Sequence, residues 1–280
     1  MTVVDYLCNC FLPDRRALWE RSVADQDIPL KVADGFVPVD DMVARMDALG
    51  VATVVLPTVA HGRPVVDEVE FEDVATTTDE LRALTDAHPG RFAGMWAVDP
   101  TTGAAGVRSA EDALADPVVV GLYLHTHSFD RPFDHADYYP YYDLCGRLGV
   151  PMVMQAGTSG GRMPSQCGQP VGVDRPAIYF PDTNFVLSHT GWPWVDEAIA
   201  MALKFSNVYL GTGSWPPAHW SSSLVDFVRR VGRRKVLFGT NFPTVDHRRA
   251  LDQLDRLDLG DDARDGLLGG NARRVFRRLG

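Results

Sequence analysis

With 280 residues, 45% of them hydrophobic and 23% charged, the chain is long enough for two average domains or for one large α/β barrel with a sizeable core. Its formal net charge of -10 argues against a nucleic acid partner, because a phosphate backbone requires a basic protein surface. No apolar run reaches the roughly 18 residues that a membrane-spanning helix needs, so we expect no membrane partner either.

Eight apolar runs of strand length alternate with amphipathic segments along the chain. The runs cover residues 2–9, 51–57, 91–98, 118–126, 150–156, 184–189, 207–212 and 235–240. The helical patterns between them include VDDMVARMDALG, TDELRALTDAHPG, DYYPYYDLCGRLG, WVDEAIAMALKFS and SSLVDFVRRVG. Continuous apolar runs such as VATVVLP are typical of a parallel sheet that is buried on both faces. Because eight such units follow one another, the pattern predicts an α/β fold, a (β/α)8 TIM barrel, that forms a single domain over residues 1–280.

Three long irregular segments follow predicted strands. They cover residues 57–75, 127–135 and 157–175. In a barrel, such segments gather at the C-terminal ends of the strands, where active sites lie. We expect them to form a lid or a pocket wall, and ordinary surface loops are the alternative for residues 57–75.

The first residues and the cysteines indicate where in the cell the protein is found, and the last residues indicate a helix. The first residues, TVVDYLCNC, are strand-like and carry no basic leader, so we expect no signal peptide. Four cysteines (Cys8, Cys10, Cys145 and Cys167) form no CxxC pair, which is typical of reduced thiols and a cytoplasmic location. The basic C-terminal stretch NARRVFRRLG has apolar residues between its arginines and indicates an amphipathic final helix.

Seven segments together resemble the amidohydrolase-related branch of the amidohydrolase superfamily. In chain order they are DDMVARMDALGVATVVLPT, HPGRFAGMWAVDP, VVGLYLH, YYDLCGRLGVPMVMQAG, FPDTNFVLSHTG, KVLFGTNFP and LLGGNARRVF. They cover nearly the whole chain in the order that the family has. The resemblance implies a TIM barrel and an enzyme, because the family contains hydrolases, lactonases and non-oxidative decarboxylases. Some of its lactone hydrolases work without a bound metal.

The resemblance also assigns the positions of a metal site, and most of them are changed in this chain. These positions fall on Leu7 and Asn9 in the first strand, Gln155 in the fifth, His189 in the sixth and Asn241 in the eighth. The family has His-x-His, His, His and Asp there, so His189 alone is retained. On the fourth strand the family's Gly-x-Lys-x-His corresponds to Gly121, Tyr123 and His125.

These substitutions argue against a catalytic metal. Zinc is held by His, Cys and carboxylate side chains, whereas amides carry no charge and Leu7 has no lone pair. Asn241 also lacks the basicity of the aspartate that it replaces. We therefore expect no metal and no other cofactor. A competing interpretation places zinc on Cys8, Cys10 and His189, although strand alternation puts both thiols on the face opposite to Asn9.

A metal-free site would rely on histidines and neutral hydrogen-bonding groups. We predict His189 as a general acid or base with a pKa of about 6.5, assisted by His125, and a hydrogen-bonded core histidine is the alternative for His189. His127 and His135 are better explained as parts of a solvated strand end.

Further side chains are candidates for binding the substrate. Asn9, Gln155 and Asn241 can each donate two N–H bonds to a carboxylate or a developing oxyanion. Tyr123 shares the face of His125 and can bond a substrate oxygen. Trp96 and Trp192 are candidate pocket walls for an aromatic ligand, with core or surface packing as the alternative.

These features predict a metal-independent hydrolase that acts on a small cyclic or aromatic carbonyl or carboxylate compound. A lyase of a bacterial pathway (decarboxylase, dehydratase or cyclase) is the second hypothesis, and a catalytically silent barrel that binds a small molecule is the third. The family resemblance also implies a homodimer or a tetramer.

Overall fold

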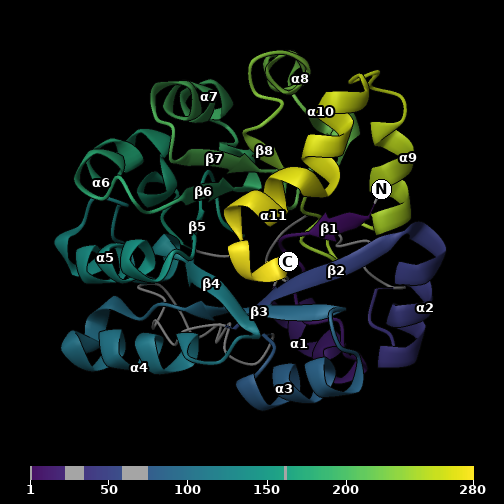
Figure 1. The fold of residues 1–280 in the computed structure, drawn as a ribbon, viewed down its shortest axis with the longest axis horizontal. Helices are drawn as coiled ribbons and strands as arrows, with labels where there is room; N and C mark the ends of the chain where they lie inside the picture. The colour runs from purple at the N-terminus through teal and green to yellow at the C-terminus, as the bar shows by residue number, and fades with distance from the viewer. Residues whose placement is uncertain (1, 23–34, 59–74, 161–162) are drawn as a thin grey trace.

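Eight parallel strands form one sheet in which each strand lies beside its neighbour in sequence, from β1 to β8 (Figure 1). The structure is a computed structural model that describes residues 2–22, 35–58, 75–160 and 163–280. The strands are β1 (Val3–Asp5), β2 (Val51–Pro57), β3 (Phe92–Ala97), β4 (Val119–Leu124), β5 (Met152–Gln155), β6 (Phe185–Ser188), β7 (Val208–Gly211) and β8 (Val236–Leu237). Each predicted apolar run contains one of them.

The residues that follow β1 and β8 join the two edges of the sheet. The backbone N–H of Tyr6 donates to Phe238 (3.1 Å), and that of Asn241 donates to Leu7 (2.8 Å). The N–H of Asn9 in turn donates to Phe242 at 2.7 Å. These bonds leave no free edge between the first and last strands, and the predicted (β/α)8 TIM barrel is confirmed.

Helices cover the outside of the barrel between successive strands (Figure 1). The helices are α1 (Arg16–Ser22), α2 (Val39–Leu49), α3 (Thr78–Ala87), α4 (Ala104–Leu114), α5 (Tyr139–Leu148), α6 (Asp174–Tyr179), α7 (Val195–Lys204), α8 (Ser222–Arg229), α9 (His247–Leu254), α10 (Asp261–Asp265) and α11 (Asn271–Val275). Local sequence sets several boundaries. Thr77 and Glu80 form a capping box at the start of α3, and Gly50 ends α2 with a left-handed φ of 68°.

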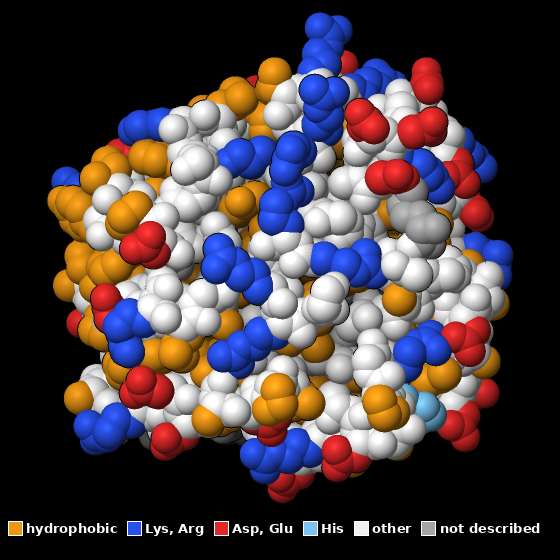
Figure 2. All heavy atoms as spheres, viewed as in Figure 1, with side chains coloured by type: hydrophobic (Ala, Val, Ile, Leu, Met, Phe, Trp, Pro, Cys, Tyr) orange, Lys and Arg blue, Asp and Glu red, His pale blue; other side chains and the backbone are white. Residues whose placement is uncertain are grey.

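The core has two layers. One lies between the strands and the helices, and the other fills the barrel and includes Tyr6, Leu7 and Tyr123. Val275 and Phe276 belong to this inner layer, so the predicted final helix closes one end of the barrel with its apolar side. Figure 2 views this end and shows Lys and Arg side chains over it.

The interior position of Tyr6 requires glycine at two nearby places, Gly211 at the end of β7 and Gly239 just after β8. A Cβ on Gly211 would lie 2.0 Å from the Tyr6 hydroxyl oxygen, and one on Gly239 would lie 2.4 Å from the ring. Any other residue at these two places would therefore displace the Tyr6 ring.

Three further expectations concern the first predicted loop, the cysteines and membrane-spanning helices. Residues 59–74, which make up most of the first predicted loop, lie outside the described residues. All four cysteines are buried and free. Within the described ranges, no helix is both long and apolar enough to cross a bilayer.

Candidate active site

Three histidines gather where β4, β5 and β6 end. His125 and His127 follow β4, and their ring centroids lie 5.4 Å apart. His189 follows β6 and interacts electrostatically with both other rings. Gln155 ends β5 and hydrogen-bonds His125. Because the strands are parallel, these side chains meet at their C-terminal ends, which is the end at which barrel enzymes bind substrates.

His189 is held in a fixed orientation. Its Nδ1 lies 2.7 Å from the hydroxyl oxygen of Ser188, and the side chain is buried. Its backbone has a φ of 63°, and that of Thr190 has a φ of 57°, so two consecutive residues with side chains adopt a left-handed conformation. Such conformations are costly and are concentrated at functional sites. Within the described part of the chain, Nε2 has no hydrogen-bond partner, so this nitrogen is available to a ligand.

The pKa of His189 differs from the expected value. Burial, followed by the proximity of His127, lowers this pKa from 6.5 to about 3. The imidazole is therefore neutral at neutral pH, and Nε2 can accept a proton or a hydrogen bond. This finding favours the role of a base over that of an acid in the free protein.

His125 is part of a hydrogen-bonded chain of side chains. The hydroxyl of Tyr123 donates to Oε1 of Gln155 at 3.0 Å, and Nδ1 of His125 lies 2.6 Å from the hydroxyl oxygen of Ser128. Burial lowers the pKa of His125 well below its ordinary value, and His127 and His189 lower it further. Burial also raises the pKa of Tyr123, which stays a neutral donor. The chain fixes the His125 ring on both sides.

The sequence interpretation of His127 as a solvated residue is wrong. Its side chain is fully buried, and its Nε2 bonds the carbonyl of Gly157 at 2.9 Å. A Cβ on Gly168 would lie 2.5 Å from Nε2, so the segment after β5 covers the ring. His135, in contrast, has a side chain that is 40% exposed. The alternation His-Thr-His was the signal for a common face of His125 and His127, but it carried no information on what covers that face.

The amides of Asn9 and Asn241 bond each other. Nδ2 of Asn9 donates to the backbone oxygen of Asn241 (3.1 Å) and to its Oδ1 (2.8 Å). Nδ2 of Asn241 donates to the hydroxyl of Ser214 at 2.5 Å. Asn9 therefore has both of its N–H bonds engaged within the protein, whereas two were expected to serve a substrate. Oδ1 of Asn9 and one N–H of Asn241 are left for a ligand.

A buried carboxylate lies beneath this pair of amides. Asp5 accepts hydrogen bonds from the backbone N–H groups of Leu7 (3.0 Å) and Thr240 (3.1 Å) and from the Thr240 hydroxyl. Its Oδ2 also lies 2.8 Å from Nε2 of His247, and the exposed fraction of each side chain is at most 1%. The carboxylate thus joins the end of β1, the end of β8 and the start of α9, next to Asn9 and Asn241.

The two tryptophans predicted to bind substrate have different surroundings. Trp192 lies three residues after His189, is largely exposed, and its ring centroid is 4.9 Å from that of Trp215. Trp96 packs in the layer between strands and helices, because it alternates on β3 with Met95, which faces the barrel interior. The position of Trp192 suits an aromatic wall, whereas that of Trp96 does not.

The residues at the family's metal positions do not fit a divalent metal. Leu7 lies in the inner core, and the amides of Asn9 and Asn241 are bonded to each other. Among the residues that the structure describes, no three His, Cys, Asp or Glu side chains gather closely enough to share an ion. The alternative zinc site on Cys8, Cys10 and His189 is therefore wrong, since Cys8 packs in the helix-facing layer.

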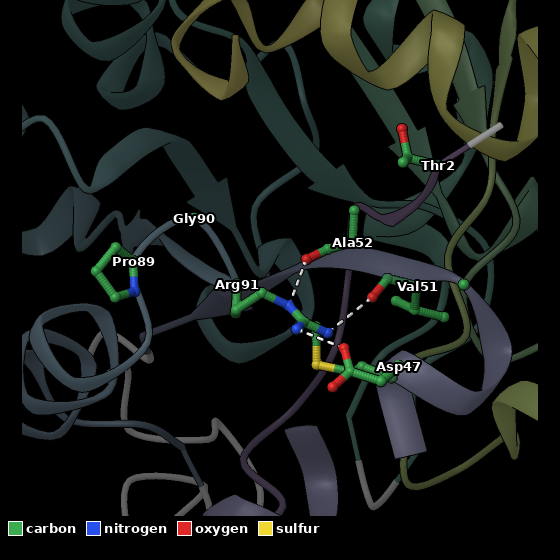
Figure 3. A pocket seen from close by; sticks show the side chains of 9 residues that line it. Thr2, Asp47, Val51, Ala52, Pro89, Gly90 and Arg91 are labelled. Atoms are coloured by element: carbon green, nitrogen blue, oxygen red, sulfur yellow. Dashed lines mark hydrogen bonds and ion pairs between the residues drawn. The ribbon is translucent and has the colours of Figure 1, made fainter. Parts of the chain in front are cut away.

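A surface cavity lies at the other end of the barrel. Its volume is about 370 Å³, and Gly50, Val51, Gly90 and Arg91, which precede or begin β2 and β3, line part of it (Figure 3). The Arg91 guanidinium bonds Ala52 and Val51 carbonyl oxygens and pairs with Asp47 at 2.6 Å. Because the donors of this arginine are engaged and the strands' C-terminal ends are distant, we assign this cavity no catalytic role.

Because His189 is buried as a neutral ring, we expect the protein to lose stability in acid. The folded pKa of His189 (about 3) lies below the unfolded value of 6.5, so the unfolded chain binds protons more readily between these values. The neutral His189 ring makes its full contribution to the free energy of unfolding above about pH 6.5. Below that pH, the free energy of unfolding falls by up to about 1.4 kcal/mol per pH unit. Urea unfolding at a series of pH values should show a shallower slope for His189→Gln and the wild-type slope for His135→Gln. An unchanged slope in His189→Gln would contradict the burial-induced shift.

A model of a protein family described as amidohydrolase matches residues 25–278. A search of curated proteins gave no match.

Solved structures of several TIM-barrel proteins are similar in fold. An uncharacterised TIM-barrel protein from Bordetella bronchiseptica is 22% identical, with a TM-score of 0.75 over 100% of this chain and 99% of that one. The 2,6-dihydroxybenzoate decarboxylase from Rhizobium is 17% identical, with a TM-score of 0.71 over 100% of both chains. The 5-carboxyvanillate decarboxylase from Sphingomonas paucimobilis is 19% identical, with a TM-score of 0.67 over 99% of both chains. These structures share the fold, and the family match over residues 25–278 shows that the chain belongs to the amidohydrolase family.

Proposed function

We propose that this protein is a metal-independent hydrolase of a small cyclic or aromatic carbonyl compound, such as a lactone or an amide, and that His189 is its general base. The observation that carries the proposal is the state of His189. The ring is neutral, Ser188 orients its Nδ1, and its Nε2 has no partner among the described residues. A neutral imidazole with an unpartnered nitrogen can accept a proton from water.

The reaction follows from this arrangement. Nε2 of His189 takes a proton from water as the water oxygen attacks the carbonyl carbon, and the imidazolium then returns the proton to the leaving oxygen or nitrogen. N–H groups of Gln155 and Asn241 are the candidate donors to the oxyanion, and the exposed Trp192 is a candidate wall for a ring. An imidazole with a pKa of about 3 is a weak base. A carboxylate on the substrate would raise this pKa by stabilising the imidazolium, so we expect an anionic substrate.

Decarboxylation is the second candidate, and the similar structures of two aromatic-acid decarboxylases support it. The decarboxylation of an aromatic acid requires a proton donor for the ring carbon. The lowered pKa values of His125 and His189 leave few imidazolium donors at neutral pH, which favours hydrolysis.

The test is an activity assay of the chelator-treated protein with aromatic lactones, aryl amides and hydroxybenzoates as substrates. The assay is carried out in water that is labelled with a heavy oxygen isotope. A hydrolase should turn over a lactone or an amide and incorporate one labelled oxygen into the product acid. Release of carbon dioxide without incorporation of the label would replace hydrolysis by decarboxylation. Activity that disappears with the chelator and returns with zinc would contradict metal independence.

A further inference from the structure

Three consecutive strands are followed by residues that have a left-handed backbone although they carry side chains. His189 follows β6, Ser214 lies beyond β7 and Asn241 lies beyond β8, with φ values of 63°, 63° and 54°. These strands lie side by side in the sheet (Figure 1). Such a conformation is uncommon for residues other than glycine and is concentrated at functional sites. Ser214, which the sequence patterns did not indicate, therefore shares a backbone feature with two candidate site residues.

Ser214 lies at the same end of the barrel as His189. Trp192, three residues after His189, has its ring centroid 4.9 Å from that of Trp215, the neighbour of Ser214 in sequence. The backbone N–H of Ser214 donates to the carbonyl of Thr240 at 3.3 Å, which holds the turn after β7 against the end of β8. Ser214 is half-buried, so its hydroxyl is accessible to a ligand at the mouth of the barrel.

A backbone carbonyl fixes the direction of the hydrogen bonds that reach Ser214. The Asn9 side chain lies 3.1 Å from the backbone oxygen of Asn241, and because this oxygen can only accept, the Asn9 group there is Nδ2. The same Nδ2 lies 2.8 Å from the side-chain amide of Asn241, which therefore presents Oδ1 to Asn9 and Nδ2 to Ser214. The hydroxyl oxygen of Ser214 accordingly accepts a bond, and its own proton points elsewhere.

The O–H group of Ser214 is left as a donor for a ligand. Among the residues that the structure describes, no atom accepts a hydrogen bond from it, so the chain from Asn9 through Asn241 ends in a free donor. A hydroxyl whose oxygen accepts a hydrogen bond is a stronger donor, because successive bonds polarise one another. The two amides thus strengthen the Ser214 donor without adding a charge to the site.

We propose that the Ser214 hydroxyl donates a hydrogen bond to the carbonyl oxygen of the substrate and stabilises the negative charge that this oxygen gains when water attacks. The assignment rests on the proposed hydrolysis with His189 as the base. Ser214 keeps its proton and forms no covalent bond, because its oxygen accepts from the Asn241 amide, which is not a base. Asn9 is a positioning residue that acts through Asn241.

Removal of the hydroxyl should lower kcat with little change in KM, because the hydrogen bond strengthens as the charge develops. Ser214→Ala and Ser214→Gly should each lower kcat for dihydrocoumarin, an aromatic lactone, by about 10²- to 10³-fold. Glycine adopts a φ of 63° without strain, so Ser214→Gly should unfold at no lower temperature than the wild type by circular dichroism. Low activity in a fully stable protein would exclude a purely structural role for the hydroxyl.

The matched control is Ser109→Ala, since Ser109 is exposed on α4 and bonds the Ala105 carbonyl of its own helix. It should keep the wild-type kinetics. Asn9→Ala tests the positioning role. It should lower kcat by about tenfold in the wild-type background and by less than about twofold in Ser214→Ala, because Asn9 acts through the Ser214 hydroxyl. Equal effects in both backgrounds would overturn this role.

A binding measurement separates the Ser214 assignment from the proposed function. Isothermal titration calorimetry with phenylphosphonate, a tetrahedral anion, should give a Kd that Ser214→Ala raises by at least about tenfold. This loss of binding in a protein that hydrolyses no lactone would support the Ser214 donor and reject hydrolysis. Lactone hydrolysis at the wild-type rate in Ser214→Ala and Ser214→Gly would overturn the Ser214 donor and retain hydrolysis. A wild type that neither hydrolyses the lactone nor binds phenylphosphonate would overturn both.

Discussion

Replacing His189 by glutamine should lower kcat/KM by about 10² to 10⁴-fold on the substrate that the wild type hydrolyses, which is the usual contribution of a general base. Glutamine keeps a hydrogen-bonding group near Ser188 but cannot take a proton from water. The measurement is steady-state kinetics as a function of pH. Because the pKa of His189 is about 3 in the free protein, kcat/KM of the wild type should stay high well below pH 6.5.

The matched control is His135→Gln, in which an exposed histidine of the loop after β4 loses the same ring. It should retain the kinetics of the wild type. If His189→Gln were as active as the wild type, or if kcat/KM fell on acidification through about 6.5, His189 would not be the base and another residue would have to activate water.

Replacing Asp5 by asparagine should destabilise the fold by about 3 kcal/mol, because it disrupts the buried hydrogen bonds that Asp5 accepts and leaves Nε2 of His247 without its acceptor. Asp5 accepts bonds from Leu7, Thr240 and His247, whereas an asparagine offers one acceptor oxygen and brings two N–H donors that need acceptors. The measurement is urea unfolding at neutral pH, compared with the wild type as the change in midpoint at constant slope.

The control for this prediction is Asp86→Asn, an exposed aspartate near the end of α3 whose change should alter stability by less than about 0.5 kcal/mol. A loss of stability in Asp5→Asn as small as in the control would show that the pair at the closure of the barrel contributes little. A large loss accompanied by weaker substrate binding would agree with its location beneath Asn9 and Asn241.

Much of the fold could be predicted from the sequence, because its signals are local. Each buried strand produces an apolar run such as VATVVLP, and each covering helix produces an amphipathic repeat, so eight alternations indicate a barrel. The candidate site is only partly local. His125, Gln155 and His189 each follow or end a predicted strand, and parallel strands bring such positions to the same end of a barrel.

The chain's own sequence determined the (β/α)8 architecture and the replacement of the family's metal ligands by Leu7, Asn9, Gln155 and Asn241. The tertiary structure alone decided how these groups are used. Asn9 bonds Asn241, which is 232 residues away, and Asp5 pairs with His247 across 242 residues. The segment at Gly168 covers His127, and this burial lowers the pKa of the histidine. The sequence had favoured a solvated position for it. Local periodicity tells which face a side chain occupies, but contact partners and burial depend on how the barrel closes and on which segments cover its end.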